Sequence, residues 1–148
     1  MIRRIYLAIA LMLCVLLTVG CSTTRSTAHG SDTSIPGQKM YPLSPEKADR
    51  VLIQAMTYQF PTSPIVRVEL PHKGYFVTSR FALDSHDFTA RMISSKGIDE
   101  AGKTVDGYYF EVIDSGTMPI SGSVRASSLF NKIIETANGE AKPIPITR

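Results

Sequence analysis

The segment TVDGYYFEVI, residues 104–113, decides the fold. Successive side chains of an extended strand point to opposite faces of a sheet. One face of this strand would carry Tyr108, Phe110 and Val112. The opposite face would carry Tyr109, Glu111 and Ile113. The period of two predicts a β-strand that is buried on at least one face.

Three further strands precede this segment, and each is bounded by residues typical of turns. Residues 120–124 are a candidate for a short fifth strand after it, although Gly122 weakens the pattern. The connections are short, which favours an antiparallel meander. The expected strands are 65–70, 75–83, 88–98 and 104–113, and the expected turns are 71–74, 84–87 and 99–102.

Two amphipathic helices are predicted to flank the meander. The first begins at Ser44-Pro45, where serine caps a helix and proline suits the first helical position, and it ends before Pro61. The second covers about 127–137 and stops at Asn138-Gly139. Leu52 on the first helix, and Phe130 and Ile133 on the second, belong to apolar stripes. We therefore predict an α+β fold: an antiparallel four- or five-stranded meander with the N-terminal and C-terminal helices packed on one face.

The amino terminus has the organisation of an export signal. Arg3 and Arg4 precede an apolar run from 5 to 19, and Gly20-Cys21 ends it. A membrane-spanning helix needs about 20 apolar residues, so this run is short for a permanent span. A cleaved signal is the favoured interpretation, with an uncleaved anchor as the alternative.

The segment Leu17-Thr18-Val19-Gly20-Cys21 resembles the lipobox of bacterial lipoproteins, with Thr18 where leucine is usual. The resemblance implies that the Cys21 thiol receives a diacylglyceryl group and that the peptide is cut between Gly20 and Cys21. The competing interpretation is ordinary cleavage after Ala28, which would release a soluble chain beginning at His29.

Composition divides the remainder of the chain. In residues 22–43, 12 of 22 positions are Ser, Thr, Gly or Pro, which predicts a flexible tether with an r.m.s. span of roughly 25 Å. The predicted organisation is therefore a signal peptide at 1–20, a lipidated cysteine and tether at 21–43, one α+β domain at 44–139, and a disordered tail at 140–148.

Charge and cysteine content narrow the classes of function that the chain could have. Without Arg3 and Arg4, 14 basic residues face 13 acidic ones, a net charge of +1 that does not favour a nucleic-acid binder. If Cys14 is removed with the signal and Cys21 is lipidated, no thiol remains for a disulfide, a metal site or a nucleophile. No metal and no cofactor are expected.

Candidate catalytic chemistry is sparse. Asp84-Ser85-His86-Asp87 is the one cluster that combines a nucleophile, a base and carboxylates, but these residue types also typify a turn between strands. The turn interpretation predicts that His86→Ala costs no more than about 0.5 kcal/mol. His72 and His29 are expected to be solvated, and Gly102-Lys103-Thr104 is expected to be a hairpin turn rather than a phosphate site.

Adjacent aromatic residues on the strands suggest an interaction surface. Tyr75 and Phe76 must point to opposite faces, as must Tyr109 and Phe110. Phe76 and Tyr109 are therefore a possible interaction surface on the face away from the core. The alternative is that these two side chains simply form a cross-strand pair on a solvated sheet face.

These features favour a membrane-tethered envelope lipoprotein without catalytic activity, which acts by contact with envelope proteins. In a host with two membranes, Ser22 after Cys21 resembles the signal for transport to the outer membrane, facing the periplasm. The alternatives are a small periplasmic hydrolase that uses His86 with Asp84 or Asp87, and a carrier of an apolar ligand. A carrier needs an apolar cavity of about 300 Å³ or more under the helices.

Overall fold

The computed structural model describes residues 25–29, 39–81, 84–116 and 119–147. The predicted signal peptide, the lipobox and Cys21 lie outside these residues. The elements in chain order are β1 (Arg25–His29), β2 (Lys39–Met40), α2 (Pro45–Gln59), β3 (Val66–Val68), β4 (Gly74–Phe81), β5 (Asp84–Ile98), β6 (Thr104–Gly116), α3 (Pro119–Glu140) and β7 (Ile144–Pro145).

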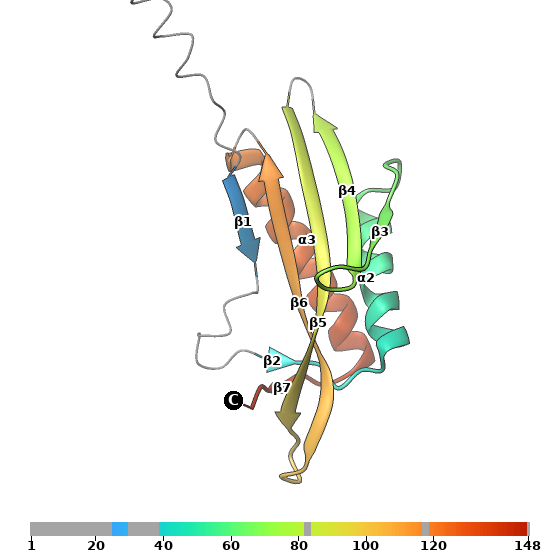
Figure 1. Ribbon diagram of the computed structural model, residues 1–148, viewed down its shortest axis with the longest axis vertical. Coiled ribbons are helices and arrows are strands. Elements are labelled where there is room, and N and C mark those ends of the chain that lie inside the picture. The colour runs from blue at the N-terminus through green and yellow to red at the C-terminus, as the bar shows by residue number, and fades with distance from the viewer. Residues whose placement is uncertain (1–24, 30–38, 82–83, 117–118, 148) are drawn as a thin grey trace, which may run out of the picture.

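Five strands form one antiparallel sheet in the order β1-β6-β5-β4-β3, and β2 pairs with β7 in a small second sheet. Both helices lie on the same side of the large sheet, behind the strands as Figure 1 is drawn. The predicted α+β class, the antiparallel sheet and the placement of both helices on one face are confirmed.

The core lies between the helices and the sheet. Ser44 accepts a hydrogen bond from the backbone N–H of Lys47 and so caps α2, as predicted. Leu52 of α2, Ile133 of α3 and Phe88 of β5 are fully buried in one continuous apolar cluster. Phe130 packs against the same cluster and is partly buried.

The long β5–β6 hairpin extends beyond the helices, and short segments cover its far half. Gly102 adopts a positive φ of 77° in the connecting turn, where Asp99 accepts hydrogen bonds from the N–H groups of Ala101 and Lys103. Tyr41 pairs through its backbone with Tyr108 of β6. A Cβ on Gly107 would lie 2.2 Å from the carbonyl oxygen of Tyr41, so this close crossing requires glycine.

Two predicted boundaries are wrong. The predicted tether contains β1, which pairs with β6, and its last residues include the buried Tyr41 and Leu43. The predicted disordered tail contains β7, where Ile144 is buried. Composition missed both ends because the few buried apolar residues stand among many polar ones, and because almost any residue can make the backbone pairing of a strand.

Two local predictions are also wrong. Residues 84–87 are not a turn, because β5 begins at Asp84. Residues 120–124 are not a fifth strand, because α3 begins at Pro119. Pro119 suits the first turn of a helix, where a missing N–H costs no hydrogen bond.

Candidate functional site

The face of the sheet opposite the helices is the first candidate surface. Along β5, the buried Phe88 and Ala90 alternate with the partly exposed Thr89 and Ile93. Since alternate side chains share a face, the second set belongs to the side without helices. The partly exposed residues of this open sheet face, placed by strand register, are Phe76, Thr89, Arg91, Ile93, Tyr109 and Ile113.

The register arranges this open sheet face in rows across the strands. Phe76, Thr89 and Ile113 form one row, while Ile93 and Tyr109 form another. Between the rows, Arg91 Nη1 lies 3.7 Å from Glu111 Oε2, and the Glu111 side chain is only 10% exposed. Burial, followed by the negative charge of Glu111, raises the pKa of the Tyr109 phenol.

The predicted interaction residues Phe76 and Tyr109 are therefore on one face, but they are not a cross-strand pair. Phe76 is on β4 and Tyr109 on β6, with β5 between them. Their partners on β5, Thr89 and Ile93, are four residues apart. The surface is consequently broader than the single aromatic contact of the alternative interpretation.

A buried polar cluster lies on the helix-covered side of the sheet. His86 Nδ1 lies 2.9 Å from Asp114 Oδ1, and the two residues are 4% and 3% exposed. Arg125 of α3 donates a hydrogen bond of 2.7 Å to Ser79 Oγ, and Ser79 is the cross-strand neighbour of His86. A Cβ on Gly116 would lie 2.1 Å from the His86 ring, so the glycine provides the space that the imidazole fills.

This cluster gives His86 a partner that the sequence alternative did not name. That alternative joined His86 to Asp84 or Asp87; in the structure His86 lies beside Asp114, and Asp87 accepts a hydrogen bond of 2.7 Å from Thr78 Oγ1. A histidine oriented by a carboxylate is one half of a serine-hydrolase arrangement. Both side chains are buried, however, and neither lines either of the two surface hollows described next. We interpret the cluster as a structural one.

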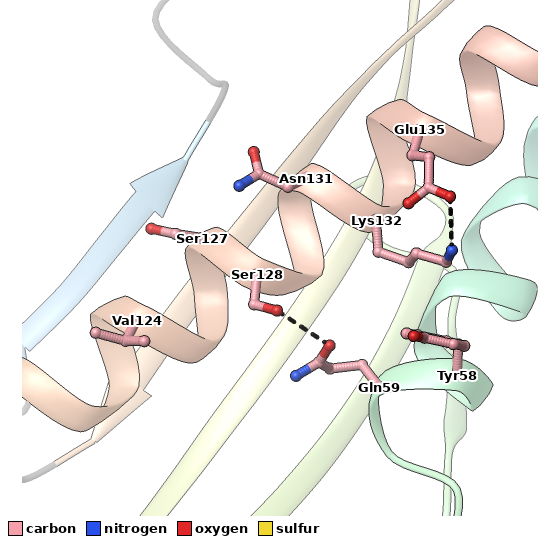
Figure 2. A pocket seen from close by; sticks show the side chains of 8 residues that line it. All are labelled: Tyr58, Gln59, Val124, Ser127, Ser128, Asn131, Lys132 and Glu135. Atoms are coloured by element: carbon pink, nitrogen blue, oxygen red, sulfur yellow. Dashed lines mark hydrogen bonds and ion pairs between the residues drawn. The ribbon is translucent and has the colours of Figure 1, made fainter.

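A hollow of about 550 Å³ lies between the end of α2 and the outer face of α3 (Figure 2). Ser128 Oγ lies 3.3 Å from Gln59 Oε1 across it. The Lys132 ammonium lies 4.4 Å from the Tyr58 ring centroid and 2.9 Å from Glu135 Oε1. The walls are Tyr58, Gln59, Val124, Ser127, Ser128, Asn131, Lys132 and Glu135. This polar surface groove does not match the apolar cavity under the helices that a carrier would need.

A smaller hollow of about 200 Å³ lies beside the first turn of α2 and includes Asp49, Arg67 and Met92. The Tyr75 hydroxyl donates a hydrogen bond of 3.0 Å to Asp49 Oδ2, which links β4 to α2. Burial, followed by this hydrogen bond, raises the pKa of the Tyr75 phenol. Asp49 thus connects a helix to the sheet.

Within the described residues, no group of three or more His, Cys, Asp or Glu side chains is arranged to hold a metal ion. Across the same parts of the chain, none of the helices combines the length and the apolar character that a membrane crossing requires. Comparison with protein-family models, with curated proteins and with solved structures found no match.

The sequence prediction missed Ser79, Asp114 and Arg125. Asp114 had a detectable signal, because it continues the alternation of Phe110 and Val112 and so falls on the buried face. A polar residue at a buried position needs a partner, and that requirement would have pointed to a second buried polar group. Ser79 had the same signal, because it continues the alternation of Tyr75 and Val77 on β4, whereas Arg125 carried none. Of the other histidines, His72 is exposed, as expected, and His29 lies in β1 rather than in a tether.

Proposed function

We propose that this chain is a lipid-anchored protein of the bacterial envelope that acts by binding another envelope protein, without catalysis. The lipobox resemblance at Leu17 to Cys21 supports the anchor, and Ser22 supports the outer membrane as its destination where the host has two membranes. The location of β1 adds support, since the alternative cleavage after Ala28 would cut inside this paired strand.

The open sheet face supports the proposal that this chain binds another protein. It combines two rows of mainly apolar and aromatic side chains with the Arg91–Glu111 ion pair, on a surface that neither helix covers (Figure 1). Protein interfaces combine an apolar centre with polar groups that fix the partner's orientation, and aromatic residues and arginine are enriched among their main contributors. The partner that fits is a protein with an apolar strip flanked by a complementary pair of charges.

Photo-crosslinking in intact envelopes tests this function. A photoreactive phenylalanine analogue replaces Phe76 or Tyr109 in separate variants. We expect a discrete adduct of the same mass from both positions, because both side chains face the same partner. The matched control is the same replacement of Tyr58, which is 69% exposed on α2, on the helix side of the protein.

The Tyr58 variant is expected to give no such adduct. If Phe76 and Tyr109 give no adduct, or if all three positions react equally, the open sheet face is not a specific contact surface and the proposed function fails.

A further inference from the structure

The structure leaves very little chain between the proposed lipid anchor and the sheet. β1 begins at Arg25, so three residues, 22–24, separate it from Cys21. A fully extended chain gains at most about 3.6 Å per residue, so the Cα atoms of Cys21 and Arg25 are within ~15 Å of each other. Acyl chains in the hydrocarbon hold the backbone of Cys21 at the membrane surface.

The pairing of β1 determines which end of the domain this short link holds at the membrane. Arg25 is the register partner of Gly116, which is the partner of His86 on β5. Arg80 and Ser85 form a pair one residue closer to the β4–β5 connection, and both are exposed. The start of β1, the end of β4, the start of β5 and the first turn of α3 lie toward the upper end of Figure 1.

The opposite end of the domain is the β5–β6 turn, at the bottom of Figure 1. β5 has 15 residues, and a strand rises about 3.3 Å per residue, so its length is ~45 to 50 Å. The end of the sheet at which β1 begins is therefore close to the anchor, and the β5–β6 turn is far from it.

We propose that the end of the sheet at which β1 and β5 begin and β4 and β6 end faces the phospholipid headgroups, with the strands standing upright from the bilayer. This orientation rests on the proposed lipid anchor. Arg80, which is exposed at this end, adds a basic group, and basic groups are attracted to anionic headgroups. The β5–β6 turn then points away from the membrane, and the open sheet face is left accessible from the side.

Fluorescence quenching by headgroup-labelled lipid tests the orientation. Ser85→Cys and Lys103→Cys place a fluorophore at exposed positions of the two ends. With Cys21 lipidated and Cys14 removed, the introduced cysteine is the one free thiol. The full lipidated protein is placed in vesicles whose phospholipid headgroups carry a nitroxide. We expect strong quenching of the label at position 85 and several-fold weaker quenching at position 103.

The control inserts a long flexible Gly/Ser linker between Ser22 and Thr23, which keeps the anchor but removes the short link. The difference between the two labels should then shrink. Vesicle flotation separates the two proposals. A protein that floats with equal quenching at both positions overturns the orientation and leaves the anchor intact, whereas a protein that does not float overturns both.

Discussion

Leu52→Ala and Ile133→Ala are each expected to lower the free energy of unfolding by about 2 to 5 kcal/mol. Both side chains are fully buried, one on each helix, and both belong to the apolar cluster that contains Phe88 of the sheet. A domain of this size is stabilised by about 5 to 15 kcal/mol in total. The double variant should therefore contain little folded protein.

Urea denaturation followed by circular dichroism measures this effect, because the chain contains no tryptophan for a fluorescence signal. Leu70→Ala is the matched control: the same change at a side chain that is 85% exposed should leave the midpoint nearly unchanged. If Leu52→Ala leaves the midpoint unchanged while Ile133→Ala abolishes folding, α2 is not part of the core, and the single-core account is wrong.

His86→Ala is expected to cost about 3 to 5 kcal/mol, in contrast to the near-silent substitution that the turn interpretation predicts. The substitution leaves the Asp114 carboxylate buried without the imidazole that lies 2.9 Å from it. It also removes a ring that stacks on Phe88, with the two centroids 5.9 Å apart. Removing one partner of a buried pair costs far more than removing an exposed side chain.

The same denaturation measurement tests this prediction, with His72→Ala as the exposed-histidine control. Asp114→Asn keeps a side chain of similar shape and should cost less than His86→Ala. A normal midpoint for His86→Ala, together with loss of cellular function at normal protein level, would contradict the structural interpretation and favour the hydrolase.

The local periodicity of the sequence predicted the central part of the fold. The alternation in residues 104–113 and the turn at 99–102 became β6 and the β5–β6 connection, because one face of this strand must be buried and period-two patterns report burial. The stripe around Leu52 predicted α2 for the same reason, with the cap at Ser44 marking its start.

The predictions for residues 84–87 were wrong because the residues that these side chains contact lie far away in the sequence. Asp, Ser and His at 84–87 have turn-like composition, yet in the structure Asp87 pairs with Thr78 and His86 with Asp114. Those partners are 9 and 28 residues away, so no local pattern contains them. The rows of the open sheet face depend in the same way on strand register, which places Thr89 between Phe76 and Ile113.

The most direct test of the lipid-anchored account is the intact mass of the protein extracted from membranes with detergent. The account predicts the mass of residues 21–148 plus a diacylglyceryl group, with or without a further acyl chain on the amino terminus, and it predicts that Cys21→Ser yields the uncut chain. A wild-type protein with the mass of an unmodified chain, beginning at His29 or at Met1, would contradict it.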